Sequence, residues 1–184
     1  MNSKIYIILF INILFQSGKL TLEEMYLELN ANQETDNHHI IGETKEIISI
    51  GKNILGKEIF LSQKCAQSWL DMNAHAKKDS IILSILSGFR SYEKQYNIIQ
   101  NKLMQGRSLD EILRENKLPG LSQHHSGNAI DIISNGYKLS VDFEKSPAYK
   151  WLVKNANKYG FYLQYPKNNK ENIMFEPWHW LYKE

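Results

Sequence analysis

The chain has 184 residues, of which 42% are hydrophobic, 23% are charged and 11% are aromatic. This length and composition predict one compact domain with a hydrophobic core, and they exclude collagen-like, coiled-coil and low-complexity chains. The net charge is only +2, from 22 basic and 20 acidic residues without a cluster of Lys or Arg, so we expect no nucleic-acid partner. Cys65 is the single cysteine, which excludes an intramolecular disulfide and leaves His, Asp and Glu as ligands for any metal.

The first 18 residues have the pattern of an export signal. An apolar run at 5–15 follows Lys4 and precedes the polar residues 16–18. The run is too short to span a bilayer, and it has the length of a signal-peptide core. No small-x-small tripeptide marks a cleavage site, so an uncleaved anchor and a buried segment of the domain remain alternatives. We expect residues 1–18 to be a signal peptide or a membrane anchor.

Residues 19–56 predict a short helix and a polar linker ahead of the main domain. The sequence Thr-Leu-Glu-Glu that starts at Thr21 is a capping box, which indicates a helix as far as about Leu29. The stretch Asn30–Glu43 is polar and is typical of a linker or surface loop. We expect the main domain at 57–184.

The first half of the main domain predicts a helix, a strand and two further helices. Ser62 is a candidate cap for a helix whose apolar positions recur every three or four residues, at Cys65, Ala66, Trp69, Leu70, Asn73 and Ala76. A short apolar strand and two helices follow at Ile81–Leu86, at Tyr92–Met104 and from Ser108 onward. We expect Cys65 to be a small buried hydrophobic residue rather than a nucleophile.

The second half predicts a central strand, one helix and two closing strands. The loop Ser122–Asn128 runs into the β-branched strand Ala129–Ile133. The later helix begins at Ser146 and Pro147 and ends before Gly160. Its inward face is formed by Tyr149, Leu152, Val153 and Ala156. The closing strands are expected at Phe161–Tyr165 and Ile173–Tyr182.

Candidate metal ligands occur in two segments of the chain. The segment SQHHSGNAID offers His124 and Asp131, and the segment FEPWHW offers His179. A hydrolytic zinc ion takes three protein ligands of the imidazole and carboxylate kind and keeps one position open. Glu176 is then available as a general base for the attacking water.

The spacing of these residues constrains the backbone. His124 and Asp131 are seven positions apart in the sequence, and Glu176 and His179 are three apart. Because both offsets are odd, the two members of each pair would point to opposite faces of a regular strand. The chain must therefore turn after His124 and present Asp131 from the following strand. A bulge or kink next to Pro177 is needed as well.

A third segment, SGFRSYEKQ, follows the predicted strand Ile81–Leu86 and delivers Arg90. An arginine fork suits a carboxylate or a developing oxyanion because it donates two parallel hydrogen bonds. Taken alone, Arg90 fits a surface ion pair equally well, and only the other two segments favour a role in a site.

Together the three segments resemble the VanY-type zinc D-alanyl-D-alanine carboxypeptidases, which act on bacterial peptidoglycan stem peptides. The resemblance covers residues 57–182 and rests on SGFRSYEKQ, PGLSQHHSGNAIDI, AYKWLVKNANKYGFYLQYP and FEPWH in the family's order. It implies a small α+β domain with a mixed or antiparallel sheet that carries one Zn²⁺, and helices packed on that sheet. It also implies peptidoglycan stem peptides as partners and a location in the periplasm or cell envelope of a bacterium. No oligomer is indicated, and a membrane contact is expected only through an N-terminal anchor.

The resemblance implies a role for each matched residue. It assigns the zinc ion to His124, Asp131 and His179, and the general base to Glu176. It assigns the substrate's terminal carboxylate or the oxyanion to Arg90, which would make the enzyme a carboxypeptidase.

Four further residues have weaker assignments. Gln95 and Ser122 match polar positions that line the peptide terminus in similar enzymes. Gln164 departs from the family, which often has Arg there, so a substrate contact is lost or replaced. His125, beside a candidate ligand, is expected to be an ordinary loop residue.

The reaction expected from the resemblance is hydrolysis of the terminal D-Ala-D-Ala bond of a stem peptide. The alternatives of the same fold are an LD-carboxypeptidase and a peptidoglycan endopeptidase. A non-catalytic cell-wall binding module that keeps its zinc for structure is the alternative of another class, and Glu176 argues against it.

Overall fold

The computed structural model describes residues 19–31, 39–136, 138–171 and 173–184. The expected signal peptide or anchor at 1–18 lies outside the described residues, as does the stretch 32–38 of the expected linker. Among the helices of the described part, none has the length and apolar character needed to cross a membrane.

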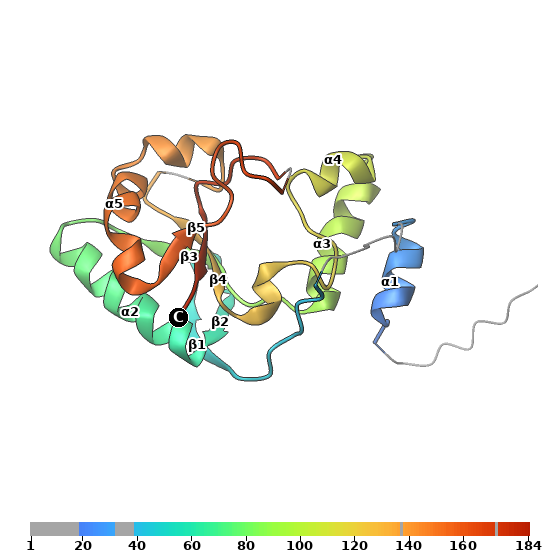
Figure 1. Cartoon of the computed structure of the whole chain (residues 1–184), viewed down its shortest axis with the longest axis horizontal. Coiled ribbons are helices and arrows are strands. Elements are labelled where there is room, and N and C mark those ends of the chain that lie inside the picture. Colours follow the sequence, from blue (N-terminus) through green and yellow to red (C-terminus); the bar gives the residue numbers. More distant parts are fainter. Residues whose placement is uncertain (1–18, 32–38, 137, 172) are drawn as a thin grey trace, which may run out of the picture.

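The centre of the fold is a four-stranded antiparallel sheet (Figure 1). Its strands, in spatial order, are β3 (Ser84–Ser87), β4 (Ala129–Ile133), β6 (His179–Tyr182) and β5 (Phe161–Leu163). All three neighbouring pairs are antiparallel. An antiparallel sheet with helices packed on it confirms the predicted α+β fold class.

A separate two-stranded antiparallel sheet precedes it in the chain, formed by β1 (Ile47–Lys52) and β2 (Glu58–Ser62). The sequence patterns above predict neither strand. The signal was present in β2, where buried Ile59 and Leu61 alternate with their exposed neighbours. β1 lies within the stretch 19–56 and pairs with β2. The boundary between that stretch and the main domain at 57–184 stays a prediction.

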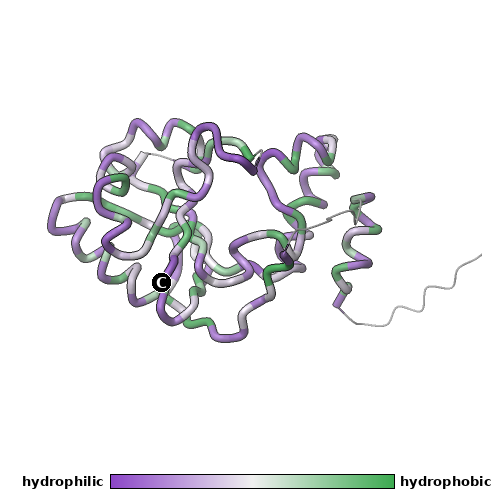
Figure 2. The backbone as a smooth tube through the Cα atoms, viewed as in Figure 1, coloured by the Kyte–Doolittle hydropathy of each residue, from purple (hydrophilic) through white to green (hydrophobic). Residues whose placement is uncertain are grey.

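Two helices, α2 (Gln63–Lys78) and α5 (Pro147–Asn155), pack against the four-stranded sheet. The Ser62 hydroxyl caps α2 as predicted, because it accepts a hydrogen bond from the Cys65 N–H. Hydrophobic stretches run through the central strands, and the helices around them alternate hydrophobic and hydrophilic residues (Figure 2). The main core between these elements contains Cys65, Trp69, Met72, Ile130, Ile132, Leu152 and Phe161.

Two of the predicted inward positions on these helices are wrong. Leu70 is 51% exposed and Val153 is 57% exposed. Each follows a buried residue, Trp69 or Leu152, by one position, which is about 100° round the helix. Both side chains therefore lie beyond the edge of the buried stripe.

A second hydrophobic cluster lies where α1 (Leu22–Glu28), α3 (Tyr92–Met104) and α4 (Leu109–Leu113) meet, beside the main core (Figure 1). Thr21 and Glu24 form the predicted capping box of α1, and α3 has its predicted bounds. The Tyr26 hydroxyl donates to the Pro119 carbonyl at 2.7 Å. This bond attaches α1 to the chain just ahead of the segment that carries the candidate ligands.

The strand β4 separates the main core from the opposite side of the sheet. Ile130 and Ile132 belong to the core, and side chains alternate along a strand, so Asp131 points the other way. On that side lies η1 (Gln123–Ser126), a short 3₁₀ helix whose His124 comes within 3.3 Å of Asp131. Two further 3₁₀ helices, η2 (Val141–Lys145) and η3 (Ala156–Tyr159), flank α5.

The predicted limits of three strands are wrong. β3 begins at Ser84 instead of Ile81, β5 ends at Leu163 instead of Tyr165, and β6 begins at His179 instead of Ile173. The chain turns just ahead of β6, where the His179 N–H donates to the Glu176 carbonyl at 3.1 Å. Pro177 has no N–H for a ladder bond, which favours this turn over a continued strand.

Candidate metal centre

Three side chains form a row across the sheet on the face opposite the main core. Asp131 of β4 is the register partner of Ser87 on β3 and of His179 on β6. Residues directly opposite one another in an antiparallel pair share one face. A shift of register between Ile85 and Ser87 brings the serine into the row.

His124 reaches the same place from η1. This turn ends at Gly127, whose φ of 73° lies in the left-handed region, and a Cβ there would come within 2.9 Å of the Ser62 nitrogen. Both facts favour glycine. The Arg90 N–H donates to the His124 carbonyl at 3.1 Å, which holds η1 beside the end of β3. The predicted turn between His124 and the strand of Asp131 is confirmed.

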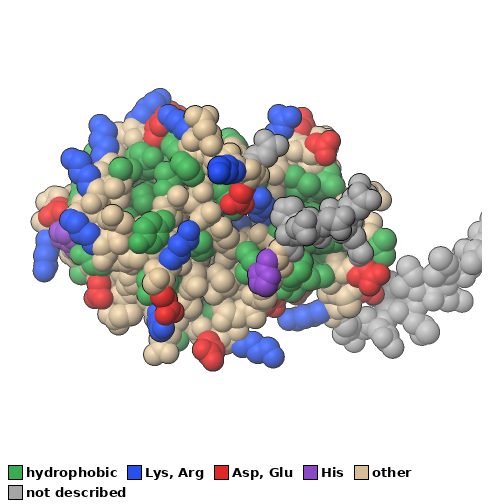
Figure 3. All heavy atoms as spheres, in the orientation of Figure 1, with side chains coloured by type: hydrophobic (Ala, Val, Ile, Leu, Met, Phe, Trp, Pro, Cys, Tyr) green, Lys and Arg blue, Asp and Glu red, His purple; other side chains and the backbone are tan. Residues whose placement is uncertain are grey.

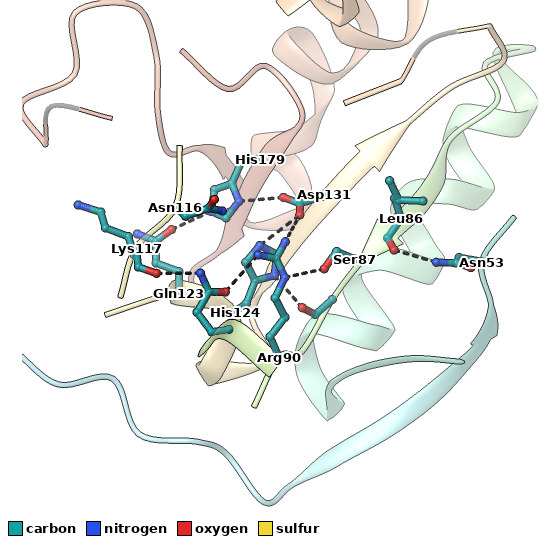
Figure 4. Close-up of polar contacts among 12 residues, drawn as sticks. Asn53, Leu86, Ser87, Arg90, Asn116, Lys117, Gln123, His124, Asp131 and His179 are labelled. Atoms are coloured by element: carbon teal, nitrogen blue, oxygen red, sulfur yellow. Dashed lines mark hydrogen bonds and ion pairs between the residues drawn. The ribbon is translucent and has the colours of Figure 1, made fainter. Parts of the chain in front are cut away.

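The structure brings His124, Asp131 and His179 together (Figure 4). One candidate ligand atom from each residue lies within 4.8 Å of the others. The Nε2 atom of His124 is 3.3 Å from Asp131 Oδ2, and the Nδ1 atom of His179 is 3.0 Å from Asp131 Oδ1. All three residues are buried.

The second ring nitrogen of each histidine has a partner of its own. His124 Nδ1 lies 2.7 Å from the Gly88 carbonyl, which can only accept a hydrogen bond, so Nδ1 carries the proton of the neutral ring. The Nε2 atom then carries no proton, and its lone pair is available to a metal ion. His179 Nε2 lies 3.0 Å from Gln123 Oε1. The Tyr165 ring stacks on the His179 ring with centroids 5.0 Å apart. Outer contacts of this kind are typical of metal-ligating histidines.

Burial and charge set the protonation states of the cluster. Burial and, to a smaller extent, the charge of Arg90 lower the pKa of His124 to about 4, so the imidazole is neutral near pH 7. Burial acts to raise the pKa of Asp131, but the interactions with His124 and Arg90 outweigh it and hold that pKa well below its ordinary value. The cluster therefore offers a neutral imidazole and a carboxylate, the forms that bind metal ions.

Arg90 lies beside the cluster rather than on the open surface. Its Nη2 contacts Asp131 Oδ2, and its Nε donates to the Ser87 hydroxyl at 2.8 Å. Its Nη1 is 3.4 Å from Gln95 Oε1. The side chain is only 16% exposed, which excludes the alternative of a surface ion pair.

Glu176 is held at the turn before β6. Its N–H donates to the Tyr165 carbonyl at 3.1 Å. The residue is 7% exposed. Burial and, to a smaller extent, the negative charge of Asp131 raise the pKa of Glu176 to about 8. A carboxyl group whose pKa lies near the working pH is well suited to exchange protons.

All the predicted site residues line one cleft of ≈ 400 Å³. Gln95 and Ser122, the predicted substrate contacts, belong to its wall although both are buried. The Gln95 amide donates to the Lys117 carbonyl at 2.8 Å. Among the described residues, Gln164 is not part of the wall and instead bonds Glu171 at 3.3 Å.

His125 is not an ordinary loop residue, so that expectation is wrong. Its side chain is fully buried in η1. Its Nδ1 is 2.7 Å from the Arg90 carbonyl, and its Nε2 accepts from the Gly120 N–H at 3.1 Å. The Thr44 N–H donates to its carbonyl at 2.9 Å. The sequence pattern does not show this role, because the contact with Arg90 joins residues 35 positions apart.

The donor set fits Zn²⁺. Two imidazoles and one carboxylate form a common set of ligands for a hydrolytic zinc ion. Atoms bound tetrahedrally at about 2.0 to 2.1 Å from zinc lie roughly 3.3 Å apart. Each nitrogen has one Asp131 oxygen near that spacing, since His124 Nε2 lies 3.3 Å from Oδ2 and His179 Nδ1 lies 3.0 Å from Oδ1. On the face drawn in Figure 3, acidic and basic side chains are interspersed, so the surface there has no single sign of charge.

A family model described as VanY, D-alanyl-D-alanine carboxypeptidase, matches residues 58–184. The chain belongs to the VanY family. The D-alanyl-D-alanine carboxypeptidase of Enterococcus faecium is 33% identical over 181 residues, which are 91% of this chain and 55% of that protein. The VanY-family chain thus spans about half the length of the curated relatives it matches, 46% of one and 55% of another.

Two solved structures show the same fold as this VanY-family chain. The LdcB LD-carboxypeptidase has a TM-score of 0.68 and 30% sequence identity, over 76% of this chain and 69% of that one. VanYB, solved in complex with D-alanine-D-alanine, has a TM-score of 0.62 and 25% identity, over 78% of this chain and 81% of that one.

Proposed function

We propose that this chain is a zinc-dependent carboxypeptidase that hydrolyses the terminal D-Ala-D-Ala bond of peptidoglycan stem peptides. The observation that carries the proposal is the convergence of two buried imidazoles and a buried carboxylate within 4.8 Å, in the cleft that Glu176 also lines. Membership of the VanY family supports it. The complex of VanYB with D-alanine-D-alanine supports the choice of substrate.

His124, Asp131 and His179 would hold the zinc ion. When bound, Zn²⁺ supplies a Lewis acid that polarises a carbonyl oxygen and lowers the pKa of a water molecule. The cluster in the described part of the chain has three donors. Three protein donors with an open position are typical of a hydrolytic site, whereas a structural site fills all four.

Glu176 and Arg90 would perform the other chemical steps. Glu176 would accept a proton from the attacking water and pass it to the leaving D-alanine nitrogen, a role supported by its burial and its pKa of about 8. Arg90 would donate hydrogen bonds to the terminal carboxylate or the oxyanion. Its place in the wall of the cleft, beside Asp131, supports this role.

Gln95 and Ser122 would contact the peptide terminus. Both line the cleft, and the Gln95 side chain has its position set by bonds to Lys117 and Arg90. A side chain held in this way presents its polar atoms in one geometry, which favours recognition of a short, fixed group.

An LD-carboxypeptidase that cuts tetrapeptide stems is the second candidate. Its support is the likeness to LdcB, at 30% identity and a TM-score of 0.68, against 25% and 0.62 for VanYB.

The candidates are separated by the stem peptides that the purified protein cleaves. Mass spectrometry follows its incubation with defined tripeptide, tetrapeptide, pentapeptide and cross-linked stems. Conversion of pentapeptide to tetrapeptide is the expected result. Loss of D-alanine from the tetrapeptide alone selects the LD activity, and cleavage of cross-links alone selects an endopeptidase. Binding of zinc without any cleavage would indicate a cell-wall binding module and overturn the proposal.

We also propose that the protein acts outside the cytoplasm, in the periplasm or cell envelope, and reaches peptidoglycan there. The apolar run at 5–15 behind Lys4 supports export. Fractionation of cells that produce the full chain, with mass spectrometry of its amino terminus, tests this. Protein in the envelope fraction that lacks about the first 18 residues, or keeps them as an anchor, is expected. Recovery of intact chain from the cytosol alone would contradict it.

A further inference from the structure

We infer that Gln123 is the positioning residue that fixes the tautomer of His179 and so turns Nδ1 of that ring toward the metal. The inference rests on the proposed zinc site and concerns a residue to which neither the sequence motif nor the proposed mechanism gives a task. The observation behind it is a single contact, in which His179 Nε2 lies 3.0 Å from Gln123 Oε1 (Figure 4).

The His179 ring is held by four neighbouring side chains. It is 4% exposed, Tyr165 stacks on one of its faces, and the His124 ring meets it edge-on with centroids 5.0 Å apart. Its Nδ1 faces Asp131 at 3.0 Å and its Nε2 faces Gln123. The ring therefore presents Nδ1 to the cluster, whereas the ring of His124 presents Nε2.

A neutral imidazole carries one proton, and its position decides whether His179 binds a metal. With the proton on Nδ1, the ring donates to Asp131 and has no lone pair on the side of the cluster. With the proton on Nε2, the Nδ1 lone pair is free for a metal and the N–H needs an acceptor on the far side. The Gln123 Oε1 is that acceptor. The Gly88 carbonyl does the same for His124 through the opposite ring nitrogen.

The hydrogen-bond acceptor of His179 can be removed by mutation, whereas that of His124 cannot. The acceptor of His124 is a main-chain carbonyl, which no substitution removes. The acceptor of His179 is a side chain, and it belongs to the residue next to the ligand His124. The Ser126 hydroxyl donates to the Gln123 carbonyl at 2.7 Å and holds this end of η1. One short turn thus supplies a ligand and the amide that orients a second ligand 56 residues away.

The experiment compares zinc affinity and ring tautomer in matched variants of the full chain. Gln123→Met keeps the length of the side chain and removes the acceptor, and Gln123→Glu keeps an acceptor and gives it a charge. Gln67→Met makes the same change at an exposed position on α2. The zinc dissociation constant is measured by competition with a chromophoric chelator, and the protonated nitrogen of His179 by long-range proton–nitrogen NMR of the zinc-loaded protein.

The expected result is a zinc dissociation constant about 10- to 100-fold higher in Gln123→Met, the usual cost of losing an outer-shell partner. Gln123→Glu should bind zinc at least as tightly as the wild type, with Nε2 of His179 protonated, and Gln67→Met should match the wild type. A Gln123→Met protein with wild-type zinc affinity would overturn the inference, as would protonation of Nδ1 in the wild type. If Gln123→Met does not fold, Gln123→Asn tests the inference in its place. The Asn side chain is one methylene shorter, so its amide should not reach His179 and zinc binding should again weaken. A wild-type chain that binds no zinc would instead refute the proposed function.

Discussion

Asp131 and His179 are register partners in the antiparallel pair of β4 and β6, and Asp131 Oδ1 lies 3.0 Å from His179 Nδ1. The sheet itself therefore sets the spacing of these two candidate ligands, since opposed residues of an antiparallel pair point to the same face. His124 comes from a turn at the end of the same face. A site built mainly on paired strands holds its geometry better than one built on loops.

The first prediction concerns the metal ligands. Replacing His124, Asp131 or His179 by Ala should remove zinc and activity together, because two remaining donors cannot hold the ion in a hydrolytic geometry. Zinc content by mass spectrometry and D-alanine release are measured on each purified variant. Full zinc occupancy in all three variants would contradict the assignment.

The second prediction separates Arg90 from the ligands that it touches. Arg90→Ala should raise KM and weaken the preference for a free terminal carboxylate over a terminal amide, since the residue acts on the substrate. Zinc should remain bound, because the substitution removes a positive charge that contacts Asp131. The measurements are steady-state kinetics on the acid and amide forms of one peptide, and zinc content. Unchanged discrimination between acid and amide would contradict the role.

Local signals account for what the sequence predicted well. The capping box at Thr21, the helix start at Ser108 and the bounds Tyr92–Met104 and Ala129–Ile133 are all confirmed. Each depends on residues a few positions apart, whose preferences act before any tertiary contact forms. The candidate ligands were found through motif and donor chemistry, which are local in the same sense.

Contacts between distant segments were beyond sequence reasoning. Pairing of Asp131 with His179 joins residues 48 apart, and the register shift that brings Ser87 opposite Asp131 depends on how two strands meet. The roles of His125 and Gln123 have the same origin, because their partners lie 35 and 56 residues away. A one-residue slip of β6 against β4 would place His179 on the opposite face from Asp131.

The third prediction concerns the stability that His125 provides. His125→Leu should lower the free energy of unfolding by about 2 to 4 kcal/mol, because the buried Gly120 N–H and Arg90 carbonyl both lose a partner. Urea unfolding followed by circular dichroism measures the change. His39→Leu, at an exposed position, is the matched control and should change stability by less than about 0.5 kcal/mol. Equal stability of the two variants would contradict the interpretation.

The fourth prediction concerns Cys65, whose thiol is fully buried. Burial raises the pKa of Cys65 from 9.0 to about 12, so at pH 8 only about one thiol in 10⁴ is ionised. Iodoacetamide at pH 8 should therefore leave the folded chain unlabelled and label it once in urea. Because the folded pKa is the higher one, the stabilising effect is complete below pH 9 and is lost as the pH rises toward 12. Rapid labelling of the native protein would show that the thiol is accessible.

The last prediction separates the general base from the metal ligands. Glu176 lies in the cleft and three residues before His179, yet it is not a member of the cluster of His124, Asp131 and His179. Glu176→Gln should therefore keep zinc bound. Its kcat should fall by about 10² to 10⁴, the usual contribution of a general base, because the amide cannot accept a proton.

The control for this substitution is Glu46→Gln, which removes a carboxylate from an exposed position and should leave kcat unchanged. Zinc content by mass spectrometry and the rate of D-alanine release from a pentapeptide stem are measured side by side for both variants. Loss of zinc from Glu176→Gln would make Glu176 a ligand. A kcat near the wild-type value with zinc in place would leave the metal site intact and refute the proton-transfer step. Among the described residues of the cleft wall, the other carboxylates are Glu115 and Asp131, and neither lies at the turn before β6.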